Sequence, residues 1–138
     1  MFNTISADNK IVNLSHKFGV VIVKYCMALN MAKKCYALSN QLLRAGTSIG
    51  ANIREAQRAQ SYPDFISKMN ISLKEADETC YWLEIMHEAG VISNNNFNIL
   101  YPKAIELLKI LKSIVKTSRN NYYVKETDNF INPLQANE

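Results

Sequence analysis

Acidic side chains and one histidine in residues 62–90 are the groups in this chain most suited to metal binding. The segment contains Glu84-x-x-His87, a spacing that a di-iron site in a helical bundle needs on each of two helices. The other histidine, His16, has Asn13 three residues before it, so the second half of such a site is missing. The pattern therefore predicts a solvated acidic face, with no metal and no cofactor. That face consists of Glu75, Asp77, Glu78, Glu84 and Glu88.

Nucleophilic catalysis has no recognisable set of residues here. The two histidines lack HExxH spacing, and no Ser-His-Asp or Cys-His order is present. The three cysteines, Cys26, Cys35 and Cys80, include no CxxC pair, which favours free thiols in a reducing compartment. Cys80 falls on an apolar stripe and is expected in the core. We predict a non-enzymatic protein without catalytic residues.

Gly46 and Gly50 lie four residues apart in the stretch RAGTSIGANIREAQRAQS. A phosphate-binding loop of the GxxxxGK[ST] type would need a lysine after the second glycine, and none follows. No strand precedes the glycines either, which argues against a dinucleotide-binding fold. Small residues one helical turn apart instead let another helix approach closely. The spacing predicts a packing segment.

Polar residues in and around this segment predict a structural network that fixes how two helices are aligned. Ser48, Asn52 and Glu55 lie about one turn apart along one helix edge, where polar side chains often set helix register. Pairing this helix antiparallel with the next one about Ser61 places three pairs side by side. The predicted pairs are Glu55 with Lys68, Arg44 with Glu78, and Ser48 with Glu75.

Basic residues concentrate in the last third of the chain. Spacings of three, four and three residues put four of them on one helix face. One interpretation is a strip that binds phosphates, and the alternative is a solvated face that pairs with acidic neighbours. The modest net charge of +4 favours the alternative. The nucleic-acid-binding candidates are Lys109, Lys112, Lys116 and Arg119, with Arg54 and Arg58 in an earlier helix.

Hydrophobic residues recur at helical spacing in four long segments. Glycine (4) and proline (3) are too scarce for the many turns of an all-β fold. Short polar connections predict an all-α fold, an antiparallel up-down-up-down four-helix bundle. We expect the bundle to occupy residues 1–119 and a tail without clear periodicity to occupy residues 120–138. The predicted helices are 8–32, 39–60, 62–89 and a fourth from the polar turn at 94–96 to about 118.

Signals for helix ends support these boundaries. Ser39 and Ser61 are expected N-caps, the second with Pro63 and Asp64 in the following turn. Gly90 is expected just past the end of the third helix. Pro102 leaves two alternatives open, because the fourth helix either bends or begins there.

The first predicted helix is apolar on two sides, which a single subunit cannot easily bury. Together with the small residues 45–51, this predicts self-assembly. The polar N-terminus does not resemble a signal peptide, and the apolar run 18–23 is shorter than the roughly 20 residues of a membrane span. We expect a cytoplasmic protein without a membrane partner.

Residues 42–93 carry three motifs that identify a family. They are Ser-Ile-x-x-Asn-Ile-x-Glu at 48–55, Ser-x-x-Asp-Phe at 61–65, and Lys-Glu-Ala-x-Glu-Thr-x-x-Trp-Leu at 74–83. The chain resembles the bacterial four-helix-bundle family, also called the ribosomal RNA intervening-sequence protein family. The resemblance covers at least residues 38–117, with the first helix similar in pattern only and the tail not at all.

The resemblance implies an antiparallel four-helix bundle that commonly assembles as a homopentamer. A related branch, the accessory proteins of diversity-generating retroelements, forms basic pentamers that bind a reverse transcriptase and nucleic acid. The function expected here is a non-enzymatic oligomeric module that binds RNA, DNA or a nucleoprotein such as a reverse transcriptase. The alternative is a purely protein-binding structural oligomer.

Overall fold

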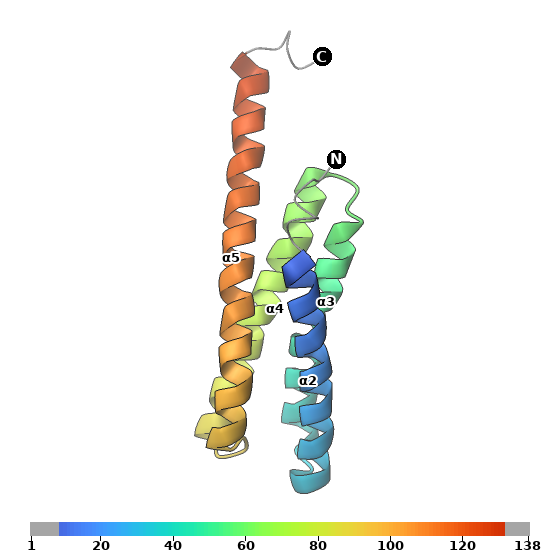
Figure 1. Cartoon of the computed structure of the whole chain (residues 1–138), viewed down its shortest axis with the longest axis vertical. Coiled ribbons are helices and arrows are strands. Elements are labelled where there is room, and N and C mark those ends of the chain that lie inside the picture. Colours follow the sequence, from blue (N-terminus) through green and yellow to red (C-terminus); the bar gives the residue numbers. More distant parts are fainter. Residues whose placement is uncertain (1–8, 132–138) are drawn as a thin grey trace.

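The computed structural model describes residues 9–131, which form four α-helices (Figure 1). They are α2 (Asn9–Lys33), α3 (Tyr36–Gln57), α4 (Tyr62–Glu88) and α5 (Asn94–Ile131). The described residues contain no β-strand. Successive helices run in opposite directions, because the links between them are only a few residues long (Figure 1). The predicted all-α four-helix arrangement is confirmed.

Each helix packs on the next helix along the chain, whereas the contact between α2 and α5 is much smaller. The core lies between the helices and is filled mainly by large aliphatic, aromatic and methionine side chains. Fully buried examples are Ile22, Leu42, Ile49, Phe65, Met69, Leu83 and Leu111. α5 is the longest helix and projects well past the ends of the other three (Figure 1).

The two glycines of α3 face residues of α2. A Cβ atom on Gly46 would lie 3.0 Å from Cγ2 of Ile22, and one on Gly50 would lie 3.4 Å from the carbonyl oxygen of Ser15. The predicted close packing is therefore confirmed. Its partner is α2 of the same chain, so these small residues no longer argue for contact with a second subunit.

The helix ends on either side of α4 follow the predicted signals. The Ser61 hydroxyl accepts a hydrogen bond from the Asp64 backbone N–H at 3.2 Å, and the Asp64 carboxylate accepts one from the Gln60 N–H at 3.1 Å. Gly90 follows the helix with a φ of +77°, which glycine adopts without steric cost. Both caps are confirmed.

Ser39 is not the N-cap of α3, contrary to the prediction. The helix begins three residues earlier, at Tyr36, and Ser39 is a fully buried residue inside it. Lys34 has a φ of +52° and reverses the chain immediately after α2. The link is therefore shorter than the sequence suggests, and Ser39 is wound into the core-facing side of the helix.

The fourth helix is longer at both ends than predicted. It begins at Asn94, where the Ser93 hydroxyl accepts a hydrogen bond from the Asn96 N–H at 3.1 Å, so it does not begin at Pro102. It continues through the predicted tail as far as Ile131. Tyr122 stacks on Tyr62 with ring centroids 6.2 Å apart. The rest of the tail, residues 132–138, lies outside the described residues, as do residues 1–8.

The second apolar side of α2 lies at the protein surface. Val20, Val23 and Met27 are 44%, 38% and 63% exposed, although Ile22 on the other side is fully buried. By length and composition alone, Lys10–Lys33 could cross a membrane, and 28% of its most apolar stretch is buried. Since one side of α2 completes the core, we interpret it as a core helix with a second apolar face left uncovered in the single chain.

Candidate nucleic-acid interface

Four of the six candidate cations form one strip along α5. Lys109, Lys112, Lys116 and Arg119 are all exposed, and their spacing keeps them on one side of the helix. Ten residues of α-helix span about 15 Å. Within residues 9–131, none of the four has an acidic partner within 4.0 Å. We call this set the α5 strip. Its ammonium and guanidinium groups are available for phosphates.

Arg54 and Arg58 lie elsewhere in the molecule. Both are exposed, Arg54 in the last turn of α3 and Arg58 as the residue that ends it. They line a surface groove between α2 and α3. α3 packs on α2 and α4 and is not a close neighbour of α5. The structure therefore separates the six candidates into two surfaces.

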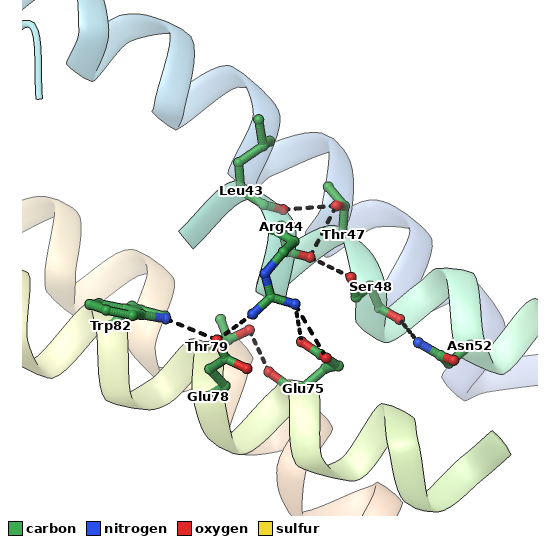
Figure 2. Close-up of polar contacts among 9 residues, drawn as sticks. All are labelled: Leu43, Arg44, Thr47, Ser48, Asn52, Glu75, Glu78, Thr79 and Trp82. Atoms are coloured by element: carbon green, nitrogen blue, oxygen red, sulfur yellow. Dashed lines mark hydrogen bonds and ion pairs between the residues drawn. The ribbon is translucent and has the colours of Figure 1, made fainter. Parts of the chain in front are cut away.

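Arg44 of α3 joins two acidic residues of α4, and Figure 2 shows its guanidinium directed between them. It forms an ion pair with Glu75 at 3.3 Å and a second, very short one with Glu78. The Trp82 indole N–H also donates to Glu78, at 3.2 Å. The predicted pairing of Arg44 with Glu78 is confirmed.

The second predicted pair is also present, whereas the third is not. Lys68 Nζ lies 3.3 Å from Glu55 Oε2. The Ser48 hydroxyl, expected beside Glu75, donates instead to the Arg44 carbonyl oxygen of its own helix at 2.6 Å. Glu75 is instead contacted by Arg44, because the arginine side chain is long enough to reach both Glu75 and Glu78.

Asn52 does not connect two helices, contrary to the register hypothesis. Its amide donates at 2.8 Å to the Ser48 carbonyl oxygen one turn earlier in the same helix (Figure 2). The buried hydrogen bond between α3 and α4 comes from Ser72, whose hydroxyl donates to the Ile49 carbonyl oxygen at 2.8 Å. Ser72 was not among the predicted network residues, although a lone serine on the apolar face of a predicted helix was a usable signal.

The Arg44 pairs make stability depend on pH. The hydrogen bond from Arg44 lowers the pKa of Glu78 below its usual 4.5. A lowered folded-state pKa contributes stability above about pH 4.5, and this is lost as the pH falls through the folded-state value. Because Arg44 is half exposed, the contribution at neutral pH should be below about 1 kcal/mol.

Arg44→Met should therefore lower the urea midpoint slightly at pH 7 and have less effect at pH 3. Lys74→Met is the control, since Lys74 is exposed on α4, has no acidic partner within 4.0 Å among residues 9–131, and its removal should change neither value appreciably. Equal destabilisation by Arg44→Met at both pH values would show that the side chain acts through packing alone.

The buried thiols are poor nucleophiles. Burial raises the pKa of Cys80 to about 11, and burial also raises the pKa of Cys26. A thiol with such a pKa is almost fully protonated at neutral pH. Within the described residues, no group of three or more His, Cys, Asp or Glu side chains is placed to hold a metal. His87 instead stacks on Phe97 at 4.0 Å and is hydrogen-bonded to Asn94.

Comparison with known proteins gives the family. Residues 7–113 match the model of the 23S rRNA-intervening sequence protein family. The chain belongs to this family. The match includes the first helix, where the sequence motifs had shown a likeness in pattern only. It ends at residue 113, so the distal part of α5 lies beyond it.

A solved structure supports the family assignment. It is a protein of unknown function from the S23 ribosomal protein family of Bacteroides thetaiotaomicron, 45% identical with a TM-score of 0.75. The similarity covers 77% of this intervening-sequence family member and 98% of that protein. This chain therefore has residues without counterparts there. No curated protein matches the chain.

Proposed function

We propose that this family member is a non-enzymatic, cytoplasmic, self-assembling module that binds nucleic acid or a nucleoprotein through the α5 strip. The observation that carries the proposal is the contrast between two sets of cations. Arg44 and Lys68 are neutralised by acidic residues of the neighbouring helix, whereas the α5 strip has no such partner among residues 9–131.

Geometry and charge support binding to a phosphate backbone. The strip is about 15 Å long and its four side chains are exposed, so it can follow several successive phosphates. Self-assembly would repeat it in each copy and multiply the number of contacts. The side chains of the strip itself include no aromatic residue on which a base could stack, which favours backbone binding without sequence preference.

The proposal predicts RNA binding that weakens steeply with salt. Four phosphate contacts should give a slope of log K against log salt of about −2.8 for single-stranded RNA, or about −3.6 for duplex DNA. Fluorescence anisotropy of a labelled 30-nucleotide RNA, titrated with protein from 50 to 300 mM KCl, measures that slope. Absence of binding at 50 mM KCl would exclude the proposed function.

A second candidate function, binding of another protein, is favoured by the exposed apolar residues. Met27 and Met31 of α2 and Tyr123, Val124 and Phe130 of α5 are all more than half exposed. A protein partner held by these residues would remain bound at high salt. Co-purification of a stoichiometric protein that persists at 1 M KCl, without RNA binding, would favour this candidate.

A further inference from the structure

Two exposed aromatic side chains continue the α5 strip beyond Arg119. Tyr123 is 66% exposed and Phe130 is 88% exposed, and both belong to the same uninterrupted helix as the strip (Figure 1). At 100° per residue, both fall within the sector of about 80° around α5 that holds the four cations of the strip. One face of one helix therefore carries cations first and aromatic rings after them. We call Tyr123 and Phe130 the aromatic pair.

A series of ring contacts anchors Tyr123 to the bundle. Its ring packs against Tyr122 with centroids 6.1 Å apart and planes inclined by 62°. Tyr122 stacks on Tyr62 at 6.2 Å, and Tyr62 stacks on the fully buried Phe65 at 6.1 Å. Tyr123 is therefore held in place although most of its surface is exposed. A side chain that is already held loses less conformational entropy when a ligand packs on it.

Cations followed by rings are the groups with which proteins bind single-stranded nucleic acid. Lysine and arginine side chains follow the phosphates, and aromatic rings stack on the bases, whatever the sequence. Tyr123 and Phe130 are seven residues apart, about 10 Å along the helix, so each ring can receive a different base. In a duplex each base is covered by its neighbours in the stack, so these rings can act only on a strand with unpaired bases.

The charge on this face also changes where the rings begin. Glu126 is exposed and lies between Tyr123 and Phe130 in sequence, about 60° and 40° away from them around the helix. It has no cationic partner within 4.0 Å among residues 9–131. A free carboxylate repels a phosphate but does not oppose an uncharged base. The face therefore favours phosphates along residues 109–119 and bases along residues 123–130.

We propose that α5 binds a single strand of nucleic acid in preference to a duplex, with the α5 strip on its phosphates and the aromatic pair stacked on its unpaired bases. This inference rests on the proposed function, because the strip must hold the strand before the rings can reach a base. It adds the kind of nucleic acid that is bound. The aromatic pair lies beyond residue 113, where the family match ends.

The preference for a single strand is the first measurement. Contacts with phosphates alone favour a duplex, because its charge density is higher. With stacking, an unstructured 30-nucleotide RNA should bind about 10-fold more tightly than the RNA duplex of the same sequence at the same salt concentration. Tyr123→Leu with Phe130→Leu should weaken binding of the single strand about 25-fold, at about 5-fold for each ring, and should change duplex binding little.

Two further variants show whether the rings themselves are responsible. Tyr36→Leu with Tyr81→Leu removes two exposed rings from α3 and α4 and should keep the affinity within a few fold. Tyr123→Trp with Phe130→Trp should keep the affinity as well, because tryptophan also stacks on bases, and its fluorescence should be quenched by the bound RNA. Circular dichroism checks that each variant is helical.

An oligonucleotide of the same length that lacks its bases isolates the phosphate contacts. The unmodified protein and the Tyr123→Leu, Phe130→Leu variant should bind this abasic strand equally well. The dependence of log K on log salt should also be the same for both proteins, because neither substitution removes a phosphate contact. Substitutions in the α5 strip should lower that dependence, which separates the role of the strip from that of the rings.

Several results would overturn the proposal. If the duplex bound as tightly as the single strand, or if the leucine variant kept its affinity for the single strand, the rings would have no role in binding. The proposed function would then still stand on the salt-dependent binding by the strip. Loss of a co-purifying protein from the leucine variant, with RNA affinity unchanged, would assign the rings to a protein partner. No RNA binding at 50 mM KCl would exclude the proposed function and this inference together.

Discussion

Replacing Lys109, Lys112 and Lys116 with glutamine should weaken RNA binding about 100-fold at 0.1 M salt. Each lost phosphate contact removes about 0.7 from the slope of log K against log salt for a single strand. Three contacts therefore lower log K by about 2.1 at 0.1 M. The substitutions should leave the fold intact, because all three side chains are exposed and none forms an ion pair within residues 9–131.

Lys10, Lys17 and Lys74 provide a matched control. They are exposed on α2 and α4, and changing them to glutamine removes the same three charges from other surfaces. If binding depends on the α5 strip, the control variant should retain affinity within a few fold. Equal losses in the two variants would mean that RNA responds to the net charge of the protein and not to a particular surface.

Gly46→Leu should lower the free energy of unfolding by about 1–3 kcal/mol, the usual cost of overpacking. Leucine is a better helix former than glycine, so propensity alone would stabilise α3 by up to about 1 kcal/mol. A Cβ at this position, however, would lie within 3.0–3.4 Å of three side-chain atoms of Ile22, which is itself fully buried. The cost of the clash with Ile22 should therefore exceed the stabilisation from the higher helix propensity of leucine.

Gly19→Ala isolates the effect of propensity. A Cβ on Gly19 would meet no atom within 4 Å, so this substitution in the middle of α2 should stabilise the protein by up to about 1 kcal/mol. Urea denaturation of the two variants measures both effects. A stabilised Gly46→Leu protein would show that α2 can move away from α3 at little cost and that the glycine is not needed for close packing.

The fold could be predicted from the sequence because its signals are local and repeat. Apolar periodicity marks each helix, and Ser61 and Gly90 act through hydrogen bonds and backbone conformation that involve only a few neighbouring residues. The pairing of Glu55 with Lys68 was predictable for a related reason, since a short antiparallel link fixes the alignment of α3 and α4.

The errors arise where distant parts of the chain decide the result. Ser39 looks like a cap in isolation, but Lys34 ends α2 abruptly and the following helix starts sooner. Residues 120–131 lack strong apolar periodicity, because few of their side chains meet the bundle; Tyr122 and Lys125 both approach the Tyr62 ring. Asn52 was expected to cross to another helix, yet its own backbone offers an acceptor at 2.8 Å.

The spacing of the candidate basic residues could be predicted from the sequence, but the residues that surround them at the protein surface could not. Spacing placed Lys109, Lys112 and Lys116 on one side of a helix, and it could not show whether acidic residues of α4 would neutralise them. Acidic residues of α4 pair instead with Arg44 of α3, which leaves the α5 strip unpaired among residues 9–131. The separation of Arg54 and Arg58 from the strip also required the helix packing, because α3 and α5 are not close neighbours.

Photo-cross-linking of bound RNA, followed by mass spectrometry of the protein peptides, tests the proposed function most directly. The measurement locates RNA on the protein under conditions in which the assembly is intact. We predict cross-links on α5 within residues 109–119 that disappear at 0.5 M KCl. Cross-links confined to the α2–α3 groove around Arg54 and Arg58, or none above background at 50 mM KCl, would contradict the assignment of the α5 strip as the nucleic-acid-binding surface.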